Sequence, residues 1–188
     1  METIKLPDSW DEITIGQYQE ICSIESDDNV RRWVEIISIL SNSDPEKVKL
    51  MNPVKFAQAV EHLSFILTLP SDRIFKDEIV IDGVTYKFKE RLESLTVGEW
   101  LDLEAYIDDT NHNIHKTFAV LYSDGTDNID KRSKVFKEKM MIGDVYAALV
   151  FFSLIGKESI QTIKDYLMSE SERMTILEEE VKRAQMQN

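Results

Sequence analysis

Two segments of this chain match each other in residue type almost position by position, and this internal similarity constrains the fold more than any other feature. The segments are DEITIGQYQEI, near the N-terminus, and ESLTVGEWLDLE, which follows 82 residues later (Thr14 to Thr96). In each, threonine is a candidate helix N-cap, and Gln17 or Glu99 stands three residues on, where it would complete a capping box. Each segment therefore predicts the start of a helix.

The similarity continues beyond these two helix starts. Acidic doublets ending at Asp28 and Asp109 each precede an aromatic-containing amphipathic helix, WVEIISIL or FAVLY, and then a DP or DG loop and an apolar helix. We infer two copies of a three-helix unit, at about residues 11–69 and 93–156, within a single domain of residues 1–168. The alternative is a chance match between two ordinary capped helices.

A β-hairpin is predicted between the two copies, at residues 78–90. In EIVIDGVTYKFKE, apolar and polar residues mix on either side of Asp82-Gly83, a dipeptide typical of two-residue hairpin turns. An isolated hairpin is marginal in water, and the segment Thr3–Leu6 is the expected third strand. The predicted fold class is therefore mainly α (α+β), with two related three-helix units joined by a β-hairpin.

The remaining pattern predicts further helices and one long loop. A helix is expected from about Pro53 to Thr68, and the run SDGTDNIDKRSK is expected to be a polar loop before a helix from about Val135 to Ile155. The helix after Pro53 is expected to bury its apolar residues, Val54, Phe56, Val60, Leu63, Phe65 and Leu67.

The formal net charge of −13 over 188 residues limits the choice of partners. Such a surface repels phosphate, which argues against direct nucleic-acid binding and against an anionic membrane surface. It favours either simple solubility or electrostatic complementarity to a basic protein. The longest apolar run, VYAALVFFSLI, is too short to span a bilayer, and the N-terminus carries no signal-peptide pattern.

The residues that most often carry chemistry form no recognisable constellation. The single cysteine, Cys22, lies between isoleucines and is expected to be buried. His112 and His115 are three residues apart beside acidic residues, but no further metal ligand is identifiable nearby. SDGTDNID fails the register of a calcium-binding loop, because Gly125 directly follows Asp124. We expect no catalytic, cofactor-binding or metal-binding residues, and therefore no enzyme.

The C-terminal segment, residues 169–188, is predicted to be a charged helix with a narrow apolar seam. Met174, Leu177 and Val181 recur at spacings of three and four residues. So thin a stripe suits contact with another helix. Its partner is either another subunit or the chain's own domain.

Four segments together resemble a known group of proteins. LPDSWDEITIGQY, IDGVTYKF, LTVGEWLDLE and ALVFFSLIGKESIQTIKDYL, in this order, resemble small proteins encoded among the virion genes of tailed bacteriophages, particularly those of Bacteroides-type bacteria, including crAss-like phages. The resemblance covers most of the chain. It implies a non-enzymatic role near the portal vertex and head–tail junction, and it supplies no catalytic residues.

The expected function is therefore a structural or auxiliary virion protein, assembled in the host cytoplasm. Its expected partners are portal, connector or capsid proteins, and possibly a second copy of itself. The expected contacts are Met174, Leu177 and Val181, together with the hairpin around Asp82 and Gly83. The alternatives are a soluble assembly chaperone absent from the mature virion and a regulatory protein acting in the host cell.

Overall fold

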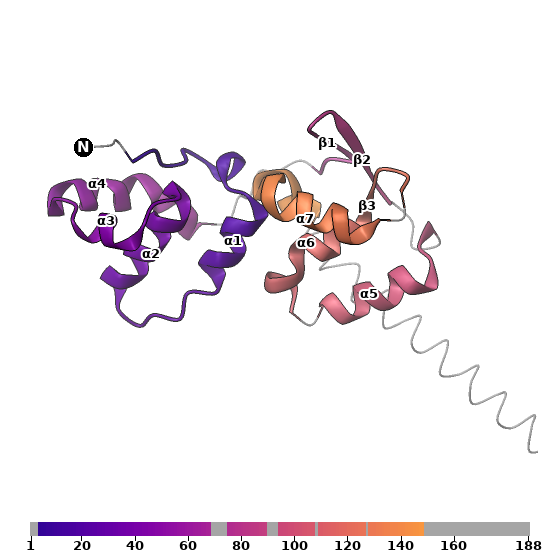
Figure 1. Ribbon diagram of the computed structural model, residues 1–188, viewed down its shortest axis with the longest axis horizontal. Helices are drawn as coiled ribbons and strands as arrows, with labels where there is room; N and C mark the ends of the chain where they lie inside the picture. The colour runs from indigo at the N-terminus through magenta and orange to yellow at the C-terminus, as the bar shows by residue number, and fades with distance from the viewer. Residues whose placement is uncertain (1–3, 69–74, 90–93, 108, 127, 149–188) are drawn as a thin grey trace, which may run out of the picture. The chain divides into compact units, whose positions relative to one another are not determined.

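Helices make up most of the described chain, and a small three-stranded antiparallel sheet accompanies them (Figure 1). The protein is therefore mainly α with a minor β component, as the sequence predicts. All the described residues fall within one unit, Met1–Ala148, so the predicted C-terminal helix lies outside them. The computed structural model describes residues 4–68, 75–89, 94–107, 109–126 and 128–148.

The elements of the described residues follow one another along the chain. In order they are the 3-10 helix η1 (Trp10–Glu12), α1 (Ile15–Cys22), α2 (Asn29–Ser41), α3 (Pro45–Lys49), α4 (Pro53–His62), the 3-10 helix η2 (Leu63–Leu67), β1 (Glu78–Ile81), β2 (Val84–Phe88), α5 (Val97–Ile107), α6 (Thr110–Leu121), β3 (Tyr122–Ser123) and α7 (Ile129–Lys139). A further helical stretch covers residues 142–148.

The predicted helix starts in the first copy are confirmed. The Thr14 hydroxyl accepts from the Gln17 backbone N–H at 3.2 Å, and the Gln17 side chain accepts from the Thr14 N–H at 3.1 Å, which completes the capping box. The Asp28 carboxylate accepts from the N–H of Val30 at 2.8 Å and caps α2. Pro45 occupies the first turn of α3, where its missing N–H costs nothing.

The second copy begins with the same two caps. The Thr96 hydroxyl accepts from the Glu99 N–H at 3.2 Å, and the Glu99 carboxylate accepts from the Thr96 N–H at 3.0 Å. Asp109 caps α6 by accepting from the His112 N–H at 3.4 Å. The paired caps predicted from the repeat are therefore present, while the duplication itself stays a prediction.

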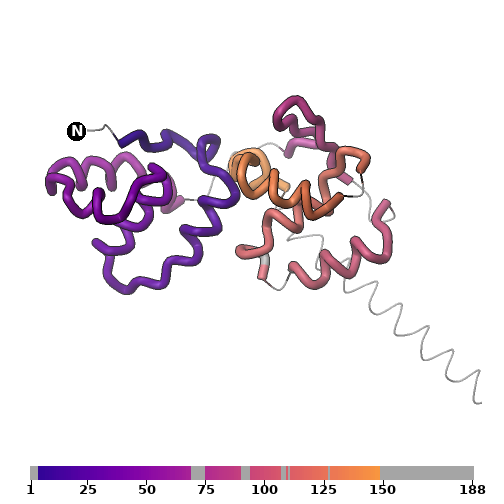
Figure 2. The backbone as a smooth tube through the Cα atoms, in the orientation of Figure 1, coloured from indigo at the N-terminus to yellow at the C-terminus, as the bar shows by residue number. Residues whose placement is uncertain are grey.

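The core is centred on α6, which contacts α1, α5 and α7 and leads directly into β3. Figures 1 and 2 show α7 beside α6, with the sheet next to this pair. Four apolar residues of α6 larger than alanine are buried. They are Ile114, Phe118, Val120 and Leu121. Around the N-terminal helices, Ile37, Leu40, Val48 and Leu63 form further buried contacts.

The hairpin is confirmed, but its expected third strand is wrong. Asp82 and Gly83 have φ values of 50° and 79°, the left-handed conformation that a type I′ turn requires. Residues 4–6 form no strand, and β2 pairs instead with Tyr122–Ser123. Because α6 ends against the sheet, the two residues that leave it extend alongside β2.

The helix predicted for residues 53–68 is shorter than expected. It ends at His62 and continues as the 3-10 helix η2. Of its apolar residues, Leu63 is buried, whereas Val54 and Leu67 are exposed. The apolar spacing was therefore a poor guide to which side chains this segment buries.

The second half of the predicted polar loop, residues 129–134, is helical. Asn128 accepts from the Lys131 N–H at 3.0 Å and starts α7 at Ile129. The helix then breaks at Met140, whose carbonyl accepts from the Ile15 N–H at 2.9 Å, while the Ile142 N–H donates to the Ile13 carbonyl at 2.8 Å. These two bonds to the N-terminal segment divide the helix that the sequence predicts as continuous.

Candidate protein-binding surfaces

The predicted contact residues are described only in part. Met174, Leu177 and Val181 lie outside the described residues. Asp82 and Gly83 form the exposed hairpin turn, and a Cβ added to Gly83 would meet no atom within 4 Å. The Asp82 carboxylate accepts a hydrogen bond from the Lys139 ammonium of α7. The hairpin tip is therefore tethered to α7 rather than left as a free acidic loop.

The outer edge of β1 is the more available part of the hairpin. The strand order β1-β2-β3 places β1 at one edge of the sheet. The Phe88 N–H donates to the Asp77 carbonyl at 2.7 Å, so the backbone groups of Asp77 face β2. In an antiparallel pair every second residue does so, and the backbone groups of Ile79 and Ile81 therefore also face β2. The backbone groups of Glu78 and Val80 consequently face outward. The Val80 side chain is 66% exposed.

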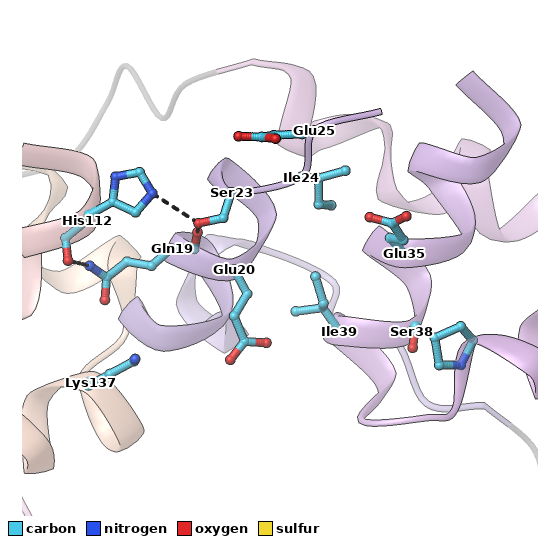
Figure 3. A pocket seen from close by; sticks show the side chains of 11 residues that line it. Gln19, Glu20, Ser23, Ile24, Glu25, Glu35, Ser38, Ile39, His112 and Lys137 are labelled. Carbon is cyan, nitrogen blue, oxygen red and sulfur yellow. Dashed lines mark hydrogen bonds between the residues drawn. The ribbon is translucent and has the colours of Figure 1, made fainter. Parts of the chain in front are cut away.

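A half-open cavity of about 440 Å³ lies beside α1 and α2 (Figure 3). Its wall also includes Pro45 at the start of α3, His112 of α6 and Lys137 of α7. From α1, α2 and the segment that joins them it takes Gln19, Glu20, Ser23, Ile24, Glu25, Glu35, Ser38 and Ile39.

Three carboxylates dominate one part of this cavity. In Figure 3, Glu20, Glu25 and Glu35 surround the side chains of Ile24 and Ile39. No ion pair within the described part of the chain engages any of the three carboxylates. We name these five residues the acidic cavity end. The sequence carries a signal for it, since glutamate stands four residues before isoleucine twice, at 20 and 24 and again at 35 and 39.

Gln19 lies at the other end of the cavity and fastens α1 to α6. Its side chain is 6% exposed, and its amide nitrogen donates to the carbonyl oxygens of Asn111, at 2.9 Å, and His112. Its amide oxygen is buried and accepts no hydrogen bond from the residues described. A buried acceptor without a donor is unfavourable, so an N–H or O–H group that reached this oxygen would stabilise this end of the cavity.

Ser23, His112 and Asp109 form a chain of hydrogen-bonding side chains at the cavity rim. The Ser23 hydroxyl lies 3.2 Å from His112 Nε2, and His112 Nδ1 lies 2.7 Å from an Asp109 carboxylate oxygen (Figure 3 shows the first contact). The hydrogen bond from His112 holds the pKa of Asp109 below its usual value. Sequence reasoning missed this arrangement, because Ser23, the C-cap residue of α1, is 89 residues away from His112 along the chain.

The order serine–histidine–aspartate is that of a hydrolytic triad, but the surroundings differ. Such a site needs N–H donors for the oxyanion, and the N–H groups of Ser23 and Ile24 already donate to carbonyls of α1. The Ser23 hydroxyl also donates to the Gln19 carbonyl at 2.8 Å. The three side chains join the end of α1 to the start of α6.

Cys22 is exposed, which corrects the prediction that it is buried. It is the last residue of α1, where the helix has passed beyond the elements that cover its start. Desolvation of the sulfur raises the pKa of the thiol, although a hydrogen bond with Tyr18 opposes this. The thiolate, which is the reactive form, is therefore disfavoured at neutral pH.

The environment of His115 differs from that of His112. Burial, followed by the charges of Lys137 and Lys116, lowers the pKa of His115 to about 4. Its Nδ1 atom is buried and has no hydrogen-bond partner among the described residues. The two histidines do not combine into a metal site, and within the described ranges no three His, Cys, Asp or Glu side chains are grouped to hold one.

The loop that resembles a calcium site in composition is organised around an arginine. Arg132 is 3% exposed and donates to the Ala119 carbonyl at 2.7 Å, to the Asp124 carboxylate at 2.9 Å and to the Thr126 carbonyl at 2.9 Å. A buried guanidinium thus occupies the position that a cation would take. The burial of Arg132 could not be predicted from the sequence, because this residue stands in a run of polar residues.

The comparisons with known proteins supply no relative. None of the helices that the structure describes is long and apolar enough to cross a membrane. No protein-family model, no curated protein and no solved structure matches this chain.

Proposed function

We propose that this protein is a non-enzymatic, protein-binding component of a tailed-phage particle, which binds portal, connector or capsid proteins. The observation that carries the proposal is the outward-facing edge of β1, with the exposed Val80 side chain at its centre. An extended segment of a partner can add to such an edge through main-chain hydrogen bonds. The resemblance of four segments to phage virion proteins supplies the class of partner.

The edge proposal is tested by removing one outward-facing donor. Val80→Pro deletes the N–H that faces away from β2, and proline is tolerated on edge strands. Val80→Thr is the matched control, because it keeps the N–H and a branched side chain. Each variant is co-expressed with the portal, connector and capsid proteins of the same phage, and co-purification is measured. We expect Val80→Pro to lose the partner and Val80→Thr to retain it; equal retention contradicts a role for this edge.

The C-terminal seam is tested by a separate deletion. Removing the chain from Glu170 onward deletes Met174, Leu177 and Val181 and leaves the unit Met1–Ala148 intact. We expect partner co-purification to be lost while the thermal unfolding midpoint of the unit changes little. Unchanged co-purification removes the C-terminal segment from the proposed interface.

An assembly chaperone is the second candidate, favoured by the net charge of −13, which suits transient binding to a basic partner. Mass spectrometry of purified particles separates the two roles. A structural component is present at a fixed copy number, whereas a chaperone binds particle proteins in the lysate and is absent from finished particles. Binding to a host protein and to no particle protein contradicts both roles.

A further inference from the structure

The acidic cavity end has the chemistry of a receptor for a cationic side chain. Ile24 and Ile39 provide apolar surface, and Glu20, Glu25 and Glu35 surround it (Figure 3). Lysine and arginine side chains likewise combine an apolar part, the aliphatic stem, with a charged group at its end. The stem can lie on the isoleucines while the head reaches the carboxylates.

The spacing of the carboxylates favours an extended cation over a metal ion. No three acidic, histidine or cysteine side chains of the described chain come close enough together to hold a metal. A guanidinium group is broader, presents five N–H donors in one plane and pairs with carboxylates through two parallel hydrogen bonds. It is also more weakly hydrated than an ammonium group, so it is desolvated more easily.

The amide oxygen of Gln19 points independently to a donor-bearing ligand. It belongs to a side chain that is 6% exposed, lines the same cavity and leaves an acceptor unsatisfied. Lys137 lies at this end, and its positive charge directs an incoming cation away from it, toward the glutamates. A peptide segment would satisfy both ends, since its backbone supplies N–H groups near its arginine.

We infer that this cavity binds an arginine side chain within a basic segment of a partner protein. The inference rests on the protein-binding function proposed above and adds the chemistry of one contact. The arginine stem packs on Ile24 and Ile39, and its guanidinium group pairs with Glu25 and Glu35. The net charge of −13 assists the approach of such a segment.

The test is a titration of the isotope-labelled full-length chain with acetyl-Ala-Arg-Ala-amide, followed by NMR. The matched probe is the citrulline peptide, which has nearly the same shape and no charge. We expect the arginine peptide to shift the amide signals of residues 19–25 and 35–39, and the citrulline peptide to shift them little. Equal responses to the two peptides, or shifts spread over other surfaces, overturn the inference.

Two double variants separate a local contact from the overall charge. Glu25→Gln with Glu35→Gln should weaken binding of the arginine peptide about fivefold, as expected for partly exposed ion pairs. Glu61→Gln with Glu138→Gln makes the same charge change at exposed positions outside the cavity and should leave the affinity within about twofold. Equal weakening by both pairs contradicts a specific contact. Magnesium chloride alone giving the same shifts also contradicts it.

The same variants distinguish this inference from the proposed function. If the Glu25 and Glu35 double variant co-purifies with phage proteins as the unaltered chain does, the cavity contact is wrong and the protein-binding role stands. If the arginine peptide binds in the cavity but no particle protein is retained, the proposed function is wrong instead.

Discussion

Gly16 of α1 faces the backbone of Lys137 so closely that a Cβ added to the glycine would lie 2.7 Å from the Lys137 carbonyl oxygen. Gly98 stands at the matching position of the second copy. The nearest atom to a Cβ added there would be the Thr96 hydroxyl oxygen, at 3.9 Å. Gly16 is buried and Gly98 is exposed. The two matched helix starts therefore share their caps but not their packing.

Alanine at these two glycines should change stability in opposite directions. Gly16→Ala should destabilise the unit by about 1–3 kcal/mol, because the carbonyl of Lys137 is backbone and can move only with α7. Gly98→Ala should stabilise it by about 0.5–1 kcal/mol, because alanine favours an exposed helical position. Urea unfolding of both variants measures the difference. Changes of the same sign would contradict the close approach of α1 and α7.

Arg132 should be the most sensitive polar residue of the second half of the chain. Arg132→Met removes donors to two carbonyls and leaves Asp124 without its buried partner, so a loss of about 2–4 kcal/mol is expected. Asp124→Asn keeps an acceptor for Arg132 and should cost less. Chemical unfolding of the two variants at pH 7 gives the comparison, and a neutral Arg132→Met would contradict the structural role.

His115 should make folding sensitive to mild acid. Its pKa is about 4 in the folded chain, and an unfolded histidine takes up its proton near pH 6.5. The unfolded state therefore binds more protons between these values, and the free energy of unfolding falls as pH drops from about 7 toward 4.

His115→Gln removes this contribution, which is on the order of 1–3 kcal/mol after allowance for solvent screening. Unfolding of the unaltered chain and the variant is compared at pH 7.5 and pH 5. The variant should lose less stability over this interval. The other two histidines are common to both proteins, so identical pH dependence would show that His115 does not stay neutral in the folded state.

The two capping boxes should contribute comparably. Thr14→Ala and Thr96→Ala each remove the hydroxyl that accepts from the third helical N–H, and each should cost about 1 kcal/mol. Serine keeps the acceptor and should restore most of the stability at either position. Thermal unfolding of the alanine and serine variants tests this; a serine variant no better than alanine would assign the loss to the methyl group.

Local chemistry explains which elements were predictable from the sequence. The caps at Thr14, Asp28 and Thr96 and the turn at Asp82-Gly83 depend on residues within four positions, so the sequence contains everything needed to identify them. The mainly α class followed from these features together.

The features that could not be predicted from the sequence depend on contacts between residues far apart in the chain. The exposure of Cys22 depends on where neighbouring helices end, and the choice of Tyr122 as a strand depends on where α6 meets the sheet. The acidic cavity end combines residues from α1, α2 and the segment between them. The exposure of Cys22 and the strand at Tyr122 leave no periodic trace in the chain, and the spacing of glutamate before isoleucine does not show that the two pairs meet at one cavity.

The backbone hydrogen bonds that join Ile13 to Ile142 and Ile15 to Met140 have a consequence for synthesis on the ribosome. The N-terminal segment emerges first, yet its backbone partners are translated almost last within the unit. Until Met140 and Ile142 are synthesised, the Ile13 carbonyl and the Ile15 N–H can form hydrogen bonds only with water. The N-terminal segment therefore cannot pack at the end of α7 before then. Completion of the unit thus waits on the arrival of Ile142, so a nascent chain stalled before that position should remain protease-sensitive at its N-terminus.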